Sequence, residues 1–316
     1  MKAAVRLKYG PPEILRVNEL SIPVATEGEI LVRVHATTVN RTDCAILWGR
    51  PFIMRFFTGL LKPSLEITGT DFAGQVEALG KNVKLFKVGD RVMGFGDFGL
   101  RSHAQYLTLL ETKAVVIIPD QLSYDQAAAC LEGAYYALDC VNMVKPKPGQ
   151  RALVYGATGA IGLSMVQFLK FYGVSVTAIC GGENQKLVTS LGADKVIDYK
   201  TTDFTKDNDT YDFIFDAVGK TAFSVSKHLL KKKGIYISAE PNLFLIISTA
   251  LYGDKKVMFR PPKSIKEALN FIKGLIERGS FRPVIDRHYS LDKIAEAFEY
   301  VATGQKIGNV IITMDA

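Results

Sequence analysis

The alternation of short apolar runs with helical stretches between residues 152 and 259 most constrains the fold. The apolar runs have the length and composition of strands and lie at 152–156, 174–180, 195–198, 212–219, 234–238 and 257–259. The segments between them leave room for helices that begin near residues 160, 183, 221 and 241. Strands that alternate with helices form a parallel sheet covered on both faces. The sequence therefore predicts an α/β, doubly wound domain in this part of the chain.

The 118 residues at the start of the chain have a different pattern. The segment 29–39, EILVRVHATTV, alternates as a half-buried strand does, and glycines bound further β-rich pieces at 69–96. Beyond residue 262 we expect a helix, an extended piece, another helix and a last strand, NVIITM. We predict a β-rich domain at 1–118 that is completed by 262–316, a doubly wound domain at 119–261, and a ligand site between them.

Charge and cysteine content narrow the functional class. The net charge of +7 is dispersed, and the densest basic run, at 227–234, is typical of a solvated helix end rather than a nucleic-acid face. The four cysteines are scattered, as in proteins of a reducing compartment. The apolar stretch 243–252 is too short to span a bilayer, which favours a buried helix and leaves a membrane-touching or dimer-forming helix open. We expect a cytoplasmic protein without nucleic acid or stable membrane insertion.

A glycine-rich turn opens the doubly wound block. In VYGATGAIGLSMVQ, at 154–167, Gly156, Gly159 and Gly162 follow the first strand and precede a helix. Such a turn lets backbone N–H groups approach a pyrophosphate at the positive end of the helix. The spacing is GxxGxxG rather than GxGxxG, so a tight turn that binds nothing is the alternative. The strand before it and the helix after it favour dinucleotide binding.

The second strand of the block indicates which dinucleotide binds. NAD sites usually have a carboxylate at the tip of this strand, whereas here the strand ends at Cys180 and is followed by GGENQK. Glu183 is a carboxylate close to the tip. The dipole of the next helix also favours a carboxylate at this position, which explains Glu183 without a contact to the ribose. Asn184, Lys186 and Tyr199 supply donors for a 2′-phosphate. We therefore predict NADP(H) rather than NAD(H).

Four segments together are more specific than the glycine turn. They are GTDFAGQVEALGKNVKLFKVGDRVMGFG at 69–96, TTVNRTDCAILWGRPF at 37–52, SLGADKVIDY at 190–199 and YDFIFDAVG at 211–219. Through these segments nearly the whole chain resembles the medium-chain dehydrogenase/reductase superfamily, in its zinc-independent, quinone oxidoreductase-like branch. The resemblance implies a GroES-like β-rich domain, a Rossmann domain and a homodimer.

The resemblance also implies the site residues. Asn40 would lie near the nicotinamide ribose and the substrate, with Asp43 supporting it and Tyr135 at a position where relatives have Thr. The implied cofactor-binding residues are Gly156, Ala157, Thr158, Gly159, Ala160 and Ile161 at the pyrophosphate; Cys180, Asn184, Lys186 and Tyr199 at the adenosine phosphate; and Ala217, Val218, Gly219, Ser238 and Asn309 along the rest of the cofactor.

No metal is expected. Zinc enzymes of the superfamily have Cys at the position of Asn40 and His at that of Thr70, and the four histidines of this chain are dispersed. Without a Lewis acid to hold an alkoxide, alcohol oxidation is disfavoured. The remaining chemistry is hydride delivery from NADPH to an electron-poor acceptor, a quinone or an α,β-unsaturated carbonyl compound, with Asn40 as the candidate donor to the developing negative oxygen.

Tyr135 leaves alternatives open. Its phenol could narrow the substrate space, donate a proton or turn into the core. A protein that binds NADP(H) as a redox sensor or scaffold without catalysis is one rival reading, and a zinc-independent alcohol dehydrogenase-like enzyme is another. A short-chain dehydrogenase is rejected, because its glycine loop lies near the start of the chain, whereas here the loop follows about 150 residues.

Overall fold

A computed structural model describes residues 1–239, 256–258 and 264–314. The chain divides into two compact units, one comprising 1–132, 264–277 and 282–316, the other 133–263 and 278–281. The domain limits predicted from the sequence, 118/119 and 261/262, stay a prediction. The helix predicted near residue 241 and the apolar stretch 243–252 lie outside the described residues.

The first unit is built on a mainly antiparallel sheet, in which β14 pairs in parallel with β15, and the end of the chain contributes to it. Its seven strands run in the order β14-β15-β3-β4-β5-β7, with β6 paired to β3. The last strand, β15, pairs antiparallel with β3, so residues about 270 positions apart in the chain become neighbours. The strands are β3 (Glu29–Val39), β4 (Asp71–Leu79), β5 (Arg91–Phe95), β6 (Tyr106–Leu110), β7 (Val115–Ile117), β14 (Ile285–Ser290) and β15 (Asn309–Thr313), beside a separate pair, β1 (Lys2–Val5) and β2 (Arg16–Glu19).

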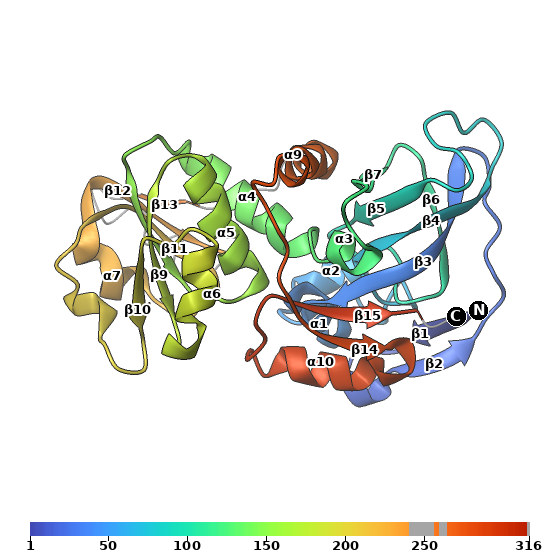
Figure 1. The fold of residues 1–316 in the computed structure, drawn as a ribbon. Coiled ribbons are helices and arrows are strands. Elements are labelled where there is room, and N and C mark those ends of the chain that lie inside the picture. The colour runs from blue at the N-terminus through green and yellow to red at the C-terminus, as the bar shows by residue number, and fades with distance from the viewer. Residues whose placement is uncertain (240–255, 259–263, 315–316) are drawn as a thin grey trace. The chain divides into compact units, whose positions relative to one another are not determined.

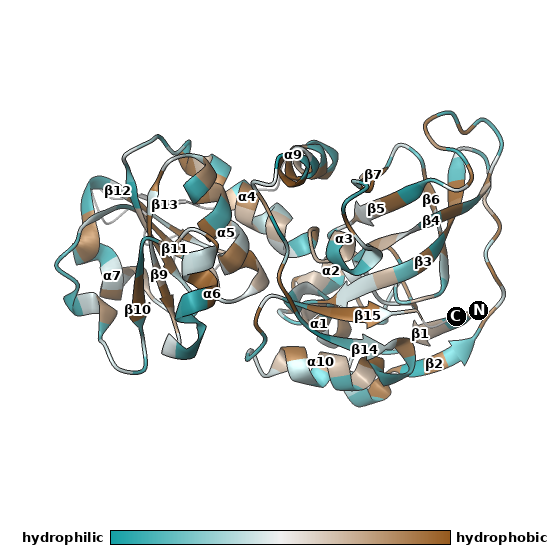
Figure 2. Cartoon of the chain, viewed as in Figure 1, coloured by the Kyte–Doolittle hydropathy of each residue, from teal (hydrophilic) through white to brown (hydrophobic). Residues whose placement is uncertain are grey.

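Two apolar clusters hold this unit together. One packs Val32, Phe72 and Val92 between the strands, and the other joins β15 to the helix that carries Phe298. Figure 2 shows β15 in the brown of hydrophobic residues, as a central strand requires. The helices of the unit are α1 (Arg41–Trp48), α2 (Met54–Thr58), α3 (Tyr124–Ala128), α9 (Ile265–Glu277) and α10 (Ile294–Ala302).

The second unit contains a six-stranded, parallel sheet. Its order is β10-β9-β8-β11-β12-β13, so the first strand of the block lies at the centre and the order reverses between β8 and β11. Ligands of such sheets bind at this reversal, outside the carboxyl ends of the strands. The strands are β8 (Arg151–Tyr155), β9 (Ser175–Cys180), β10 (Lys195–Asp198), β11 (Tyr211–Asp216), β12 (Leu230–Ser238) and β13 (Lys256–Met258).

Helices lie on both faces of this sheet, as the alternating pattern predicts. Figure 1 shows α5 and α6 on one face and α7 on the other. The helices of this unit are α4 (Glu132–Val144), α5 (Ala160–Phe171), α6 (Gln185–Ser190) and α7 (Phe223–Ser226). Residues 123–141 have a helical composition, yet they lie in two helices, α3 and α4, rather than in one. Ser123 caps α3 by a capping box with Gln126.

Candidate functional site

The glycine turn is shaped by Gly156, which follows the last residue of β8. Its φ of +76° lies in the left-handed region that favours glycine. A Cβ at this position would lie 2.6 Å from the side chain of Val218. The next residue, Ala157, is buried and donates its N–H to the carbonyl of Ile179 at 3.1 Å. The backbone therefore turns sharply at the carboxyl edge of the sheet.

The helix α5 begins at this turn with its end open. Gly159 is the N-cap residue and has no side chain to bond the N–H groups that follow. The first helical bond runs from Leu163 N–H to Gly159 O at 2.9 Å, so the N–H groups of residues 160–162 precede it. These donors and the helix dipole favour an anionic group at the turn. Thr158 and Ile161 are half-buried beside it.

The other two glycines differ in the space around them. A Cβ on Gly162 would lie 2.2 Å from Gly156 O and 2.8 Å from Ala157 Cα, so this glycine lets α5 approach the turn closely. A Cβ on Gly159 would meet its nearest heavy atom, Gly156 O, at 3.8 Å. The turn is therefore tight on the side of the protein and open at Gly159, which fits a dinucleotide pyrophosphate.

Asp216, which the sequence analysis did not select, orders the neighbouring loop. This buried residue ends β11, and its carboxylate accepts hydrogen bonds from the N–H groups of Val218 at 3.1 Å and Thr221 at 3.0 Å. The Tyr236 hydroxyl also donates to it, at 3.3 Å. Because Val218 lies against Gly156, this carboxylate fixes one wall of the glycine turn. A buried carboxylate after a strand is the signal that could have identified it.

The predicted residues of the adjacent loops lie at the same edge of the sheet. Parallel pairing places Asp216 beside Tyr155 and beside Ser238, so the loop of Ala217, Val218 and Gly219 follows the strand next to the glycine turn. Ala217 is buried, whereas Val218 and Ser238 are half-buried and Gly219 is exposed.

The tip of β9 carries a thiol in place of a carboxylate. Cys180 is buried, and this burial raises the pKa of its thiol to about 11, so it stays neutral. The Glu183 carboxylate forms an ion pair with Lys200 at 2.8 Å. Hydrogen bonding by Lys200 lowers the pKa of Glu183. The charge of the nearby carboxylate is thus balanced within the protein.

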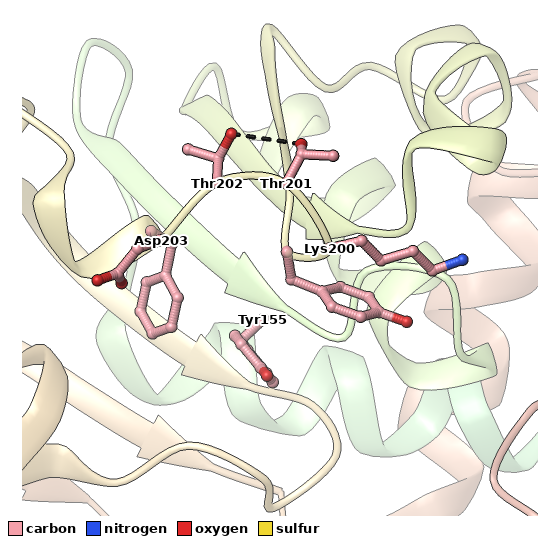
Figure 3. Close-up of a pocket in the computed structure, with 7 residues that line it drawn as sticks. Tyr155, Lys200, Thr201, Thr202 and Asp203 are labelled. Carbon is pink, nitrogen blue, oxygen red and sulfur yellow. Dashed lines mark hydrogen bonds between the residues drawn. The ribbon is translucent and has the colours of Figure 1, made fainter.

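A cavity of about 450 Å³ lies beside these tips. It is lined by Tyr155, Tyr199, Lys200, Thr201, Thr202, Asp203 and Phe204. Figure 3 shows the loop of Lys200 to Asp203 across from Tyr155, with the Lys200 ammonium extending away from Asp203. Of the three predicted phosphate donors, Tyr199 lines this cavity, while Asn184 lies in the turn before α6 and the exposed Lys186 in its first turn.

In the first unit, Asn40 is the centre of a buried hydrogen-bond network. It is the N-cap of α1, and its Oδ1 accepts the Asp43 N–H at 2.9 Å while the Asp43 carboxylate accepts the Asn40 N–H at 3.1 Å. The Asn40 Nδ2 donates to Thr70 Oγ1 at 3.0 Å and, over a longer 3.4 Å, to Thr38 Oγ1. Its amide is therefore oriented by groups of its own unit.

The two threonines connect Asn40 to two buried carboxyl groups. The Thr38 hydroxyl donates to Asp71 Oδ2 at 2.6 Å, and its N–H donates to Asp71 Oδ1 at 2.8 Å. Burial raises the pKa of Asp43 well above its usual value, assisted by the charge of Asp71. The nearby Thr70 hydroxyl opposes this shift of the pKa, because it favours the charged form of the Asp43 carboxyl. Burial likewise raises the pKa of Asp71, to about 6, against the opposing hydrogen bonds from Thr38.

His103 supports the same network in its neutral form. Its Nε2–H donates to the Thr38 carbonyl at 2.9 Å, so its Nδ1 accepts from the Thr68 hydroxyl at 2.7 Å. Burial lowers the pKa of this imidazole to about 4. Sequence reasoning treated His103 as one of four dispersed histidines and missed its contact with the strand before Asn40, since residues 38 and 103 meet only in the folded sheet.

At two positions where zinc-containing relatives have zinc ligands, this chain has the amide of Asn40 and the hydroxyl of Thr70. Asn40 and Thr70 bond each other, and neither side chain belongs to the usual zinc ligands. Among the described residues, no group of three or more His, Cys, Asp or Glu side chains is placed to hold a metal ion. The residues described here do not fit a catalytic zinc.

Tyr135 and Asn309 are further predicted site residues that are buried. Tyr135 lies in α4, fully buried, with its ring 5.3 Å from that of Tyr136. Asn309, at the start of β15, donates its side-chain amide to the carbonyls of Ala129 and Val284, each at 3.1 Å. Their predicted contacts with the cofactor stay predictions. Asn309 has in addition a structural role, because it joins β15 to two other segments of its own unit.

Two family models match the chain. The model of the alcohol dehydrogenase GroES-like domain matches residues 26–120, and that of the zinc-binding dehydrogenases matches residues 191–312. The chain is 32% identical over 310 residues to a chloroplastic quinone oxidoreductase of Triphysaria versicolor, covering 93% of this chain and 92% of that protein. It is 30% identical to a 2-methylene-furan-3-one reductase of Solanum lycopersicum, covering 99% of this chain and 79% of that protein.

Solved structures agree with this relationship. The quinone oxidoreductase of Coxiella burnetii superposes with a TM-score of 0.88 at 26% identity, covering 100% of this chain and 99% of that one. The Escherichia coli quinone oxidoreductase, solved in complex with NADPH, has a TM-score of 0.84 at 24% identity, covering 99% of this chain and 100% of that one. The predicted fold class, a GroES-like domain with a Rossmann domain, is confirmed.

Proposed function

Because the chain belongs to the quinone oxidoreductase-like branch of the medium-chain dehydrogenase/reductase family, we propose that it reduces a quinone or an α,β-unsaturated carbonyl compound with NADPH. The observation that carries this proposal is the open start of α5 beside Gly159, where backbone donors face a space that no capping side chain fills. Bound there, the cofactor supplies a hydride from C4 of its nicotinamide.

The chain's residues hold the cofactor at the carboxyl edge of the parallel sheet. The turn from Gly156 to Ile161 receives the pyrophosphate, and Ala217, Val218, Gly219 and Ser238 follow it along the neighbouring strands. The preference for NADPH is supported by the pairing of Glu183 with Lys200 and by the donors of Asn184, Lys186 and Tyr199. A fluorescence titration tests this part: NADPH should bind at least about tenfold more tightly than NADH, and equal affinities would contradict it.

The reaction needs no metal in this proposal. The hydrogen bond from the Asn40 amide to the Thr38 hydroxyl is long, at 3.4 Å. The amide can therefore donate instead to a substrate oxygen on which negative charge develops. Its other bonds, to Thr70 and Asp43, keep the amide oriented during this exchange. Solvent or a hydroxyl, with Tyr135 as the candidate, then protonates the product.

The experiment is a turnover assay with a panel of quinones and enones, after exhaustive treatment of the protein with a metal chelator. We expect NADPH oxidation with at least one acceptor and an unchanged rate after chelation. Loss of the rate on chelation and its return with zinc would contradict the zinc-independent mechanism.

A non-catalytic NADP(H) sensor is favoured by one observation, the burial of all three candidate catalytic residues, Asn40, Asp43 and Tyr135. A sensor would bind NADPH with full affinity yet show no accelerated oxidation with any acceptor. Tyr135→Phe separates the roles of the phenol: lost turnover with intact NADPH binding supports a proton donor, and an unchanged rate supports a core residue.

The oligomeric state and the cellular location belong to the same proposal. The family relationship supports a homodimer, which analytical ultracentrifugation tests directly. We also propose that the protein works in the cytoplasm. Among the described residues, no helix combines the length and the apolar character needed to cross a membrane.

A further inference from the structure

The segment around α2 presents an unusual number of apolar side chains to solvent. We call this the α2 surface, and it consists of Phe52 (60% exposed), Ile53 (61%), Phe56 (66%), Phe57 (59%), Leu60 (49%) and Leu61 (92%). Phe57 stacks on Phe98, itself 49% exposed, with ring centroids 4.9 Å apart. Single exposed apolar residues are common, but a contiguous patch of this kind marks an interaction surface.

The backbone beneath the α2 surface is held in place. Thr58 is buried, and its hydroxyl bonds the Tyr9 hydroxyl at 2.9 Å. The Ser64 N–H donates to the Thr58 carbonyl at 2.8 Å, which closes the turn after the helix. The Arg55 guanidinium lies over the Tyr9 ring, 4.5 Å from its centroid. Thr58 and Arg55 thus have partners within the protein, while the apolar side chains of the segment are exposed.

The charge around the α2 surface is positive. Residues 44–65 contain three basic residues, Arg50, Arg55 and Lys62, and no acidic residue. Arg50 and Lys62 are exposed at the two ends of the apolar segment. Acidic side chains occur only beyond its limits, at the buried Asp43, at Glu66 and at Asp97 next to Phe98.

We propose that the α2 surface docks on the surface of an anionic lipid bilayer. Aromatic and aliphatic side chains of such a patch enter the boundary between headgroups and acyl chains, and flanking Lys and Arg side chains contact anionic headgroups. A second copy of the chain fits less well, because a two-fold contact over this face would bring Arg50 and Lys62 of both copies together. The docking is peripheral and independent of whether the protein reduces quinones or enones.

The test is flotation of the full-length protein with two kinds of vesicle, phosphatidylcholine alone and phosphatidylcholine mixed with phosphatidylglycerol. We expect the protein to float with the anionic vesicles only and to be released by salt. The variant Phe56→Ser/Leu61→Ser should bind about tenfold more weakly or worse, from lost apolar burial. Arg50→Gln/Lys62→Gln should lose about fivefold in binding for each charge.

Matched controls come from the turn between β4 and β5 of the same unit. Leu85 and Val88 are 57% and 59% exposed, and Lys84 and Lys87 are exposed beside them. Leu85→Ser/Val88→Ser and Lys84→Gln/Lys87→Gln should bind as the unchanged protein does, and thermal unfolding verifies that every variant folds. The proposal is overturned if the protein does not float with anionic vesicles, or if the α2 variants and the controls bind equally. Concentration-dependent dimerisation that Phe56→Ser/Leu61→Ser abolishes would identify a second copy as the occupant.

Discussion

Gly159 and Asn40 occupy the same position, the N-cap, in the helices α5 and α1, yet the two helix starts differ. At α1, the Asn40 side chain bonds the N–H of Asp43 and the Asp43 carboxylate returns a bond to Asn40, so the helix start is closed. At α5, glycine provides no such bond and the donors stay open to a ligand. A closed helix start orients side chains, whereas an open one is available to bind an anion.

The same difference extends to the groups around each helix. The Asn40 network consists of side chains from β3, α1 and the start of β4, joined by hydroxyl groups to buried carboxyls. The glycine turn is formed by backbone, with one carboxylate, Asp216, fixing the loop beside it. These differences support the proposal that the turn at α5 binds phosphate and that the network at α1 orients one amide.

The largest effect should come from Gly162→Ala. Its Cβ would lie 2.2 Å from a backbone oxygen, so α5 must move away from the turn. We expect NADPH affinity to fall at least about a hundredfold and the free energy of unfolding by about 1–3 kcal/mol. Gly159→Ala is the control, because its Cβ has 3.8 Å of clearance: it should fold normally and lose about tenfold in NADPH affinity. Equal unfolding free energies of the two variants in chemical denaturation would contradict the difference in space between Gly162 and Gly159.

Asp216→Asn should have the next largest effect. The amide cannot accept from the N–H groups of Val218 and Thr221 through both of its ends, so one wall of the glycine turn loosens. We expect a loss of about 1–3 kcal/mol in unfolding free energy and weaker NADPH binding by calorimetry. Asp292→Asn serves as the control, because Asp292 forms an exposed ion pair with Lys2. It should change neither the unfolding free energy nor the NADPH affinity. Normal NADPH affinity in Asp216→Asn would remove its role in shaping the turn.

Asn40→Ala tests the closed helix start. Loss of the capping box should lower the unfolding free energy by about 1–2 kcal/mol. NADPH affinity should stay unchanged, because the phosphate site is in the other unit, while the turnover number should fall by about two orders of magnitude. The comparison of kcat with the NADPH dissociation constant separates these effects. If Asn40→Ala lost NADPH affinity but kept its turnover number at saturating NADPH, Asn40 would serve cofactor binding and not the reaction.

A pH effect should follow from Glu132, which accepts the Thr42 hydroxyl at 2.8 Å. Burial raises the pKa of this carboxyl to about 7, against the opposing effects of Thr42 and Lys306. The folded state thus binds a proton that the unfolded state has released, and stability falls as pH rises from about 4.5 to 7. Glu132→Gln should reduce this slope and stabilise the protein at pH 8 by roughly 1 kcal/mol. Parallel unfolding curves for both proteins across this range would show that Glu132 does not titrate there.

The smallest effect should come from Glu183→Gln. The ion pair with Lys200 is exposed, with 57% of the Glu183 side chain and 51% of the Lys200 side chain accessible, so its loss should leave the unfolding free energy unchanged. Removal of a negative charge near the tip of β9 should raise NADPH affinity about twofold to fivefold. The effect should disappear at high salt, and a gain that persists there would indicate a direct contact instead.

The sequence predicts the parts of the fold that depend on local pattern. The alternation of strands with helices and the glycine turn are each properties of consecutive residues. The residues that the structure describes, which exclude the helix predicted near residue 241, have both. The break between α3 and α4 was missed, because residues 123–141 have an almost continuous helical composition.

Contacts between distant segments could not be predicted in this way. His103 and Thr38 lie 65 positions apart, and only the pairing of strands brings them together. Asp216 was not selected because the resemblance points to the three residues after it as the cofactor contacts, while its own role depends on a fold that turns the N–H groups of Val218 and Thr221 toward it. The assignment of Asn40 came from the resemblance, and the structure adds the partners that occupy its amide.

The most direct test of the account is a single-turnover experiment with chelator-treated protein and NADPH deuterated at C4. Rapid mixing of this complex with a quinone should oxidise the bound NADPH faster than free NADPH, with a primary isotope effect and no dependence on added zinc. Oxidation no faster than in free solution with any quinone or enone, despite tight NADPH binding, would contradict the account and leave a protein that only binds the cofactor.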